Sequence, residues 1–174
     1  MARQGFLSKV RLGATALRLG MNVWPPFIGA GIHVERISED YRRVRVRLRL
    51  GLLNRNYFGT HFGGSLYAMT DPFYALMLLH NLPRGYVVWD KSSQIHYKAP
   101  GRGKVYADFT LDDARIAEVL AATTDGKRYE PTWPIDIVDT AGSVIATVEK
   151  TLYVSYRPPR APRPSTVASD KLSA

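Results

Sequence analysis

Residues 56–82 read NYFGTHFGGSLYAMTDPFYALMLLHNL and decide the fold of this chain. The stretch opens with small residues and the adjacent glycines Gly63 and Gly64, and then becomes almost wholly apolar. A segment that is apolar on nearly every side is typical of a helix enclosed by protein. Only one acid, Asp71, interrupts it, seven residues after Gly64. A lone carboxylate in such an apolar segment requires a structural or functional explanation.

The sequence predicts a helix that Gly63 and Gly64 open and that runs to about Asn81, where Pro83 and Gly85 mark its end. Pro72 lies inside this helix. Because proline cannot donate the backbone hydrogen bond to the residue four positions earlier, we expect the helix to bend beside Asp71.

Strand patterns surround this helix. The clearest is RRVRVRLRL at residues 42–50, where apolar residues alternate with Arg43, Arg45, Arg47 and Arg49. We expect one buried face and one face that is solvated or meets an anion. Further strands are predicted at residues 31–37, 87–98, 104–111, 130–138 and 143–156, with a short helix after Asp112. An antiparallel sheet around a buried helix makes an α+β fold.

Both ends of the chain are basic. Residues 1–26 carry no acid, and Leu7, Val10, Ala14, Leu17 and Met21 follow helical spacing. We expect an amphipathic helix packed on the domain, while a transit peptide remains the alternative. Residues 27–156 form the predicted domain. Residues 157–174, rich in Pro, Arg and Ser, are predicted to be a disordered basic tail.

Length and composition narrow the classes of function. The 174 residues, 45% hydrophobic, fit one globular domain, and no apolar run is long enough for a membrane span. The absence of cysteine excludes disulfides and a thiol nucleophile, and four scattered histidines predict no metal site. The net charge of +9 makes an anionic partner plausible, but no nucleic-acid-reading motif accompanies it.

These features resemble the hotdog-fold acyl-CoA thioesterase-like superfamily, in particular its phenylacetate-pathway-like branch. That branch carries the pattern Asn-x-x-Gly-x-x-His-Gly-Gly followed by an acid. Asn56, Gly59, Gly63 and Gly64 fall in register with it, and Asp71 takes the place of the acid. Phe62 stands where the family has His, and His61 comes one position earlier.

The resemblance extends to IHYKAPGRGKVYADF and DTAGSVIATVEKTLYV and covers roughly residues 30–156. It is closest to an uncharacterised subgroup. It implies a hotdog fold, in which a long antiparallel sheet wraps a central helix, and an active site shared between two subunits of a homodimer or homotetramer.

Thioester hydrolysis needs donors for a developing oxyanion and a base or nucleophile. Free backbone N–H groups at a helix start suit the first task, so Gly63 and Gly64 are candidate catalytic residues. Asn56 is expected to orient a loop or a water. Asp71 is the candidate base, with a pKa raised by apolar surroundings. It lies about 10 Å down the helix from Gly64, a distance that a two-fold dimer resolves.

A structural interpretation of the same residues competes with this one. Asp71 can satisfy backbone groups freed at the proline, and paired glycines can form a simple tight turn. His61 and Phe62 are candidate substrate-binding residues, although His61 also suits a structural role. Lys98, Arg102 and Lys104 flank a glycine-rich turn and are candidates for the phosphates of coenzyme A, or ordinary charges of an exposed turn.

The sequence therefore favours a cytoplasmic thioesterase-like protein. Its expected partner is acyl-CoA or a similar carrier-bound thioester, with coenzyme A as part of the substrate and no other cofactor. The alternative is a non-catalytic hotdog protein that binds acyl thioesters or lipids, motivated by the missing histidine. Binding to nucleic acid, motivated by the net charge of +9, is the least supported class.

Overall fold

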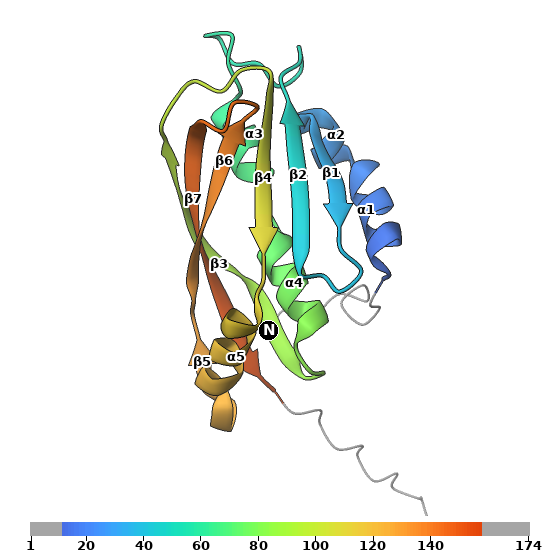
Figure 1. The fold of residues 1–174 in the computed structure, drawn as a ribbon, viewed down its shortest axis with the longest axis vertical. Helices are drawn as coiled ribbons and strands as arrows, with labels where there is room; N and C mark the ends of the chain where they lie inside the picture. Colours follow the sequence, from blue (N-terminus) through green and yellow to red (C-terminus); the bar gives the residue numbers. More distant parts are fainter. Residues whose placement is uncertain (1–11, 158–174) are drawn as a thin grey trace, which may run out of the picture.

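The computed structural model describes residues 12–157, which form helices and one antiparallel sheet (Figure 1). The helices are α1 (Ala14–Asn22), α2 (Pro25–Ala30), α3 (Gly63–Ala68), α4 (Phe73–Asn81), α5 (Asp113–Ala122) and the 3₁₀ turn η2 (Thr124–Gly126). The strands are β1 (Ile32–Ile37), β2 (Arg43–Arg49), β3 (Tyr86–Tyr97), β4 (Lys104–Thr110), β5 (Arg128–Tyr129), β6 (Thr132–Asp139) and β7 (Val144–Tyr156). The predicted α+β class is confirmed.

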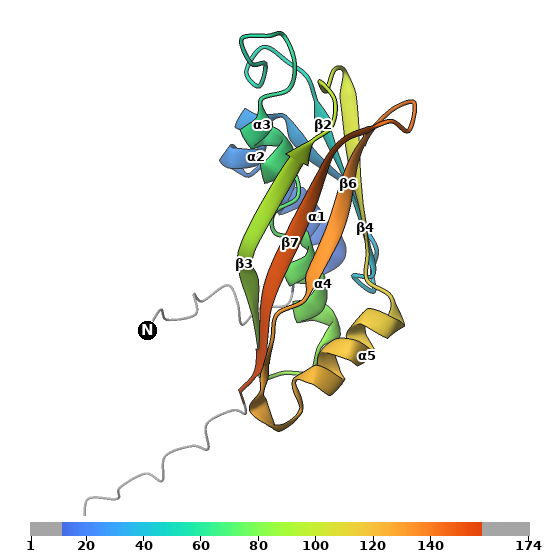
Figure 2. The same ribbon diagram turned by 90° about the vertical axis from the view of Figure 1, so that its left-hand side faces the viewer.

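The sheet has the order β1-β2-β4-β6-β7-β3, and β5 adds a short pairing to β7. All pairs are antiparallel. The sheet curls around α3 and α4, which lie along its concave face (Figure 2). The expected sheet wrapped around a central helical segment is therefore observed, with strand positions close to those predicted.

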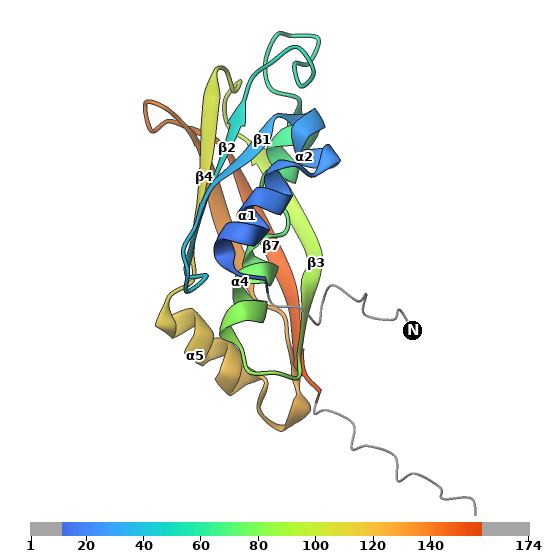
Figure 3. The same cartoon turned by 90° about the vertical axis from the view of Figure 1, so that its right-hand side faces the viewer.

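The two edges of the sheet differ. Helix α1 packs against the short edge strand β1, with α2 beside it (Figure 3). The other edge strand, β3, is twelve residues long and pairs only with β7 among the described residues. Its outer row of backbone N–H and C=O groups has no strand partner among residues 12–157 of one copy.

The central helix is broken rather than bent. The prediction of one helix from the glycines to about residue 81 was wrong, because α3 ends at Ala68 and α4 begins at Phe73. Pro72 has no N–H to continue the helix, and α4 restarts with the bond from Leu76 N–H to Pro72 O at 3.1 Å. Asp71 therefore lies in a non-helical break between two helices.

The N-terminal helix is confirmed in its described part, where Ala14 and Met21 are buried. Leu7 and Val10 lie outside the described residues, as does the predicted tail from residue 158 onward. Helix α2 was not predicted, because the prolines after Trp24 were interpreted only as an interruption. Proline is tolerated in the first turn of a helix, so the same residues begin α2. This helix crosses the predicted boundary between residues 26 and 27.

Aromatic side chains fill the space between the helices and the sheet. The ring of Phe73 lies 5.1 Å from that of Phe109 and 6.3 Å from that of Phe27. Helix α5 lies across one end of this core, as Figure 2 shows. Its Arg115 donates to Tyr74 Oη at 2.9 Å and stacks on Trp133. The predicted cap is present, since Asp112 Oδ1 accepts from Arg115 N–H.

Truncation of Phe73 tests this core. Phe73 is 1% exposed, so Phe73→Ala should lower the free energy of unfolding by about 3–5 kcal/mol in chemical denaturation. Tyr57→Ala is the control, because Tyr57 is 99% exposed and its loss should change stability by less than about 0.5 kcal/mol. A small effect of Phe73→Ala would contradict the packing described here.

Candidate active site

Asp71 belongs to a cluster of three charged groups. Lys150 Nζ lies 3.3 Å from Asp71 Oδ1 and 2.9 Å from Asp90 Oδ2. The side chain of Lys150 is fully buried, that of Asp90 is 18% exposed and that of Asp71 is 49% exposed. Lys150 Nζ also lies 5.3 Å from the centre of the Tyr67 ring. Within this cluster Asp71 is the group that solvent or a substrate can reach.

Three separate elements bring the cluster together. Lys150 lies on β7 in the same alternation as the buried Val148 and Leu152, so it points to the concave face of the sheet. Asp90 lies on β3 beside a bulge, where the pairing with β7 shifts between Asp90 and Ser92. Asp71 comes from the break between α3 and α4.

The carboxyls of Asp71 and Asp90 both contact the Lys150 ammonium, so the protonation of one depends on that of the other. Burial, and then hydrogen bonding toward Asp71, raise the pKa of Asp90 to about 6. For Asp71, burial alone would raise the pKa, but the hydrogen bond from Asp90 and the charge of Lys150 outweigh it and lower the pKa. The predicted rise in the pKa of Asp71 was therefore wrong, because its surroundings are ionic as well as apolar.

Asp90 and Lys150 were not identified from the sequence. Lys150 had a readable signal, since it is a lysine in an apolar register of a predicted strand. Asp90 had none, because the bulge beside it changes which residues of β3 face the core.

The two glycines begin α3 as predicted, and both have a packing reason to lack a side chain. A Cβ on Gly63 would come within 2.6 Å of Tyr97 Oη, and one on Gly64 would meet the Phe62 ring. No backbone carbonyl among residues 12–157 accepts from the N–H groups of Gly63 and Gly64. These groups are thus free to donate, while the two aromatic rings narrow the approach to them.

Asn56 organises its own loop. Its side-chain oxygen accepts from the N–H groups of Phe58 and Thr60, both at 3.0 Å. Its amide nitrogen donates to Thr60 Oγ1 at 2.8 Å and to His61 O at 3.1 Å. The expected orientation of a loop by Asn56 is observed, and the loop it fixes is the one that leads into the glycines.

His61 and Phe62 point to different surroundings. His61 is 3% exposed and packs against Gly101 of the turn between β3 and β4. Burial lowers the pKa of His61, so its ring is neutral near pH 7. Phe62 is half-exposed and covers Gly64. At the position where the resembled family carries histidine, this chain presents an aromatic ring.

The three cations predicted to meet phosphates lie at the turn between β3 and β4. Lys98, Arg102 and Lys104 are all exposed. This turn packs on the glycine end of the site through the bond from His61 N–H to Gly101 O at 3.0 Å. The structure thus places these cations near the glycines rather than near Asp71.

The arginine ladder of β2 is partly neutralised by neighbouring strands. Arg45 and Arg47 both pair with Glu35 of β1, and Arg45 also pairs with Asp108 of β4. The expectation of a solvated face is supported, since Arg43, Arg45 and Arg49 are exposed.

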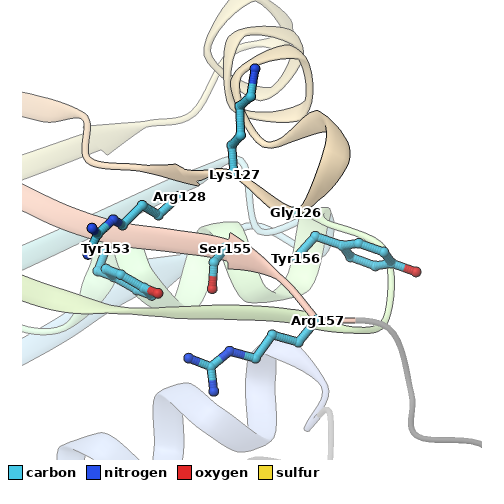
Figure 4. A pocket seen from close by; sticks show the side chains of 7 residues that line it. All are labelled: Gly126, Lys127, Arg128, Tyr153, Ser155, Tyr156 and Arg157. Atoms are coloured by element: carbon cyan, nitrogen blue, oxygen red, sulfur yellow. The ribbon is translucent and has the colours of Figure 1, made fainter.

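A shallow hollow of about 600 Å³ lies at the C-terminal end of β7 (Figure 4). Lys127, Arg128 and Arg157 line it together with Tyr153, whose pKa is lowered by hydrogen bonds from Ser155 and Arg157. Tyr153 is an odd number of residues from Lys150 along a regular strand, so the hollow and the Asp71 cluster lie on opposite faces of the sheet.

Among the described residues, no group of three or more His, Cys, Asp or Glu side chains could hold a metal ion. No helix between residues 12 and 157 is long and apolar enough to cross a membrane.

Comparison with known proteins agrees with the hotdog fold. The chain belongs to the family described as a domain of unknown function, DUF4442, whose model matches residues 13–154. No curated protein sequence gives a significant match.

Solved structures show the same fold at low identity. A Pseudomonas aeruginosa protein of unknown function, described as a probable thioesterase, is 19% identical with a TM-score of 0.71 and covers 82% of this chain and 96% of its own. A Haemophilus influenzae thioesterase is 19% identical with a TM-score of 0.62, covering 85% and 94%. The Escherichia coli PaaI protein of the phenylacetic acid degradation operon is 16% identical with a TM-score of 0.55, covering 82% and 91%.

The raised pKa of Asp90 makes a prediction about stability. Its value of about 6 in the folded protein lies above the usual 3.8, so the folded state binds this proton more tightly than the unfolded state. The resulting stabilisation is complete below about pH 3.8 and is lost as the pH rises through about 6. Its full size is about 3 kcal/mol, as an upper estimate.

Urea denaturation of wild type and Asp90→Asn between about pH 4 and pH 7 measures this contribution. The difference in unfolding free energy between the two proteins should shrink as the pH rises, because only wild type loses the Asp90 contribution. A difference that stays constant over this range would show that Asp90 titrates normally.

Proposed function

We propose that this protein is a thioesterase that hydrolyses an acyl thioester, with coenzyme A as the expected carrier, at a site formed by two copies of the chain. The observation that carries the proposal is Asp71. It is a half-exposed carboxylate, kept ionised by Lys150 and Asp90, in the break that follows the glycine-started helix. The thioesterase-like fold neighbours support the same class of reaction.

In the proposed reaction Asp71 acts as general base. A water held by its free carboxylate oxygen attacks the thioester carbonyl carbon and gives its proton to Asp71. The carbonyl oxygen becomes an oxyanion, which the N–H groups of Gly63 and Gly64 stabilise. The C–S bond then breaks, the carboxylic acid is released, and the thiolate takes the proton from Asp71.

One copy of the chain cannot supply both halves of this site. The glycines begin α3 and Asp71 follows its last residue, Ala68, so a six-residue helix about 9 Å long lies between the two halves. The unpaired edge of β3 offers a way to bring in a second copy. A long open edge strand favours pairing with another strand, and two-fold symmetry makes that partner an identical β3 running antiparallel.

The register of this pairing follows from the positions of the two halves. Along β3, Asp90 lies at the position of Asp71, because both contact Lys150, and Tyr97 lies at the position of Gly63, which it contacts. On β7 these two residues pair with Leu152 and Ala146, and the residue midway between them, Glu149, pairs with Gln94. A two-fold axis at Gln94 therefore sets Asp90 opposite the partner's Tyr97. Asp71 of one copy then faces the glycines of the other.

The remaining predicted residues fit the glycine half of the site. Phe62 and the loop held by Asn56 lie beside Gly64 and would contact the acyl group. The buried His61 would support this loop. Lys98 and Arg102 follow Tyr97 at the same end and would meet the phosphates of the carrier, together with Lys104.

Hydrolysis of acyl-CoA substrates by wild type and Asp71→Asn tests the proposed function. With a panel of short, long and aromatic acyl groups, we expect wild type to turn over at least one substrate. Removal of the base should lower kcat on that substrate by about 100-fold or more. Asp125→Asn is the matched control, because Asp125 is an exposed acid in the turn after α5 and its replacement should leave kcat unchanged.

Other outcomes separate the alternatives. Unchanged hydrolysis by Asp71→Asn would disprove the assigned base. Tight binding of acyl-CoA with no turnover of any substrate by wild type would favour the non-catalytic binding protein, an alternative supported by the Phe62 ring over Gly64.

Single cysteines test the proposed register, because the natural chain contains none. Gln94→Cys should give a disulfide-linked dimer on mild oxidation, since identical residues opposite each other on the axis have Cα atoms about 5 Å apart. Ser92→Cys is the control on the same exposed face of β3. Two residues from the axis, its copies would lie more than about 10 Å apart and should stay unlinked on denaturing gels. A linked Ser92→Cys with an unlinked Gln94→Cys would exclude this register.

A further inference from the structure

We propose that Asp90 is a positioning residue for Asp71: by holding or releasing a single proton it sets whether Asp71 meets the substrate as a paired or as a free carboxylate. Lys150 is the fixed counter-charge of the pair. This inference rests on the proposed function, because it assigns to Asp71 the role of base.

The geometry favours a single proton on the pair of carboxyls, because only then is the charge of the cluster balanced. Lys150 is fully buried and contacts both carboxyls, at 3.3 Å and 2.9 Å. With a proton on Asp90, one carboxylate balances one ammonium and the cluster is neutral. When Asp90 also ionises, two negative charges share one buried cation, and an unbalanced charge in such a place is costly. The proton on Asp90 and the state of Asp71 are therefore coupled.

The exposure of the two carboxyls assigns their roles. Asp71 is 49% exposed and can contact a water or a substrate, whereas Asp90 is 18% exposed and lies behind it on β3. Asp90 therefore acts through Asp71. While Asp90 is protonated it donates a hydrogen bond to Asp71, which lowers the ability of Asp71 to take a proton from water. Release of that proton removes the bond and adds a neighbouring negative charge, so Asp71 becomes a stronger base.

The groups that face this pair come from four parts of the chain. They are Asp90 on β3, Lys150 on β7, Asp71 in the break after α3, and the ring of Tyr67 on α3 itself. Among residues 12–157, Lys150 is the single cation paired with either acid. Titration of Asp90 thus changes the net charge of the cluster without a second cation to compensate.

A pH profile of kcat/KM tests this coupling. In wild type, kcat/KM on the best substrate should rise by about threefold or more between about pH 5 and pH 7.5, because a coupled pair shifts the strength of its base by about one pK unit or more. Asp90→Asn keeps the size of the side chain but cannot ionise. Its profile should be flat over this range, while its KM stays within about twofold of wild type. An unchanged rise in Asp90→Asn would overturn the inference, and so would a flat profile in wild type.

Carbon-13 NMR titration of the aspartate carboxyls gives a readout that does not need turnover. In wild type, the Asp71 signal should shift a second time at the pH where Asp90 titrates, and Asp90→Asn should abolish that second shift. Independent titration of the two carboxyls would overturn the proton sharing. A coupled titration in a protein that hydrolyses no thioester would instead refute the proposed function and leave the coupled pair in place.

Discussion

The buried ammonium group of Lys150 is the constraint on which the rest of the site depends. A charge without solvent must be paired, because removal of an ion from water costs several kcal/mol. Lys150 lies at the concave face of the sheet among apolar neighbours, and its two partners come from different elements. Loss of Asp71 would leave the ammonium under-compensated while Asp90 holds its proton, and loss of Asp90 would remove the shorter of the two contacts, at 2.9 Å. The cluster therefore fixes the position of the loop carrying Asp71 relative to both β3 and β7.

Two irregularities of the backbone lie at this cluster. Pro72 interrupts the central helix, which leaves Asp71 on a short non-helical segment rather than on a helix surface. The bulge at Lys91 shifts the alternation of β3, so that Asp90 and Tyr97 both face the concave side although they are seven positions apart. Regular elements would not bring these carboxyls together. Both deviations occur in the elements that, in the proposed dimer, would position Asp71 against a second copy of the chain.

The sequence predicted the scaffold better than the site. Alternating patterns located β2, β6 and β7, because successive residues of a half-buried strand are apolar on one face and polar on the other. The start of α3 at the two glycines was equally readable, whereas the break of the helix at Asp71 was not. The ionic partners of Asp71 were not, since they lie 19 and 79 residues away and one follows a bulge that no local pattern reveals. The pKa of Asp71 was predicted with the wrong sign for that reason: its local neighbours are apolar, whereas its spatial neighbours are charged.

Phe62 stands at the position where the resembled family carries histidine, and this difference affects which part of the site can carry charge. Phe62 has no hydrogen-bonding side chain, and the nearby His61 is buried and neutral, so neither supplies a charge to a substrate carbonyl. The glycine half of the site then contains only backbone donors and an apolar ring. All the titratable groups lie in the other half, around Asp71. In the proposed reaction, proton transfer and oxyanion binding therefore lie at opposite ends of β3. The proposed antiparallel pair of β3 strands would bring these two functions together twice, once on each side of its axis.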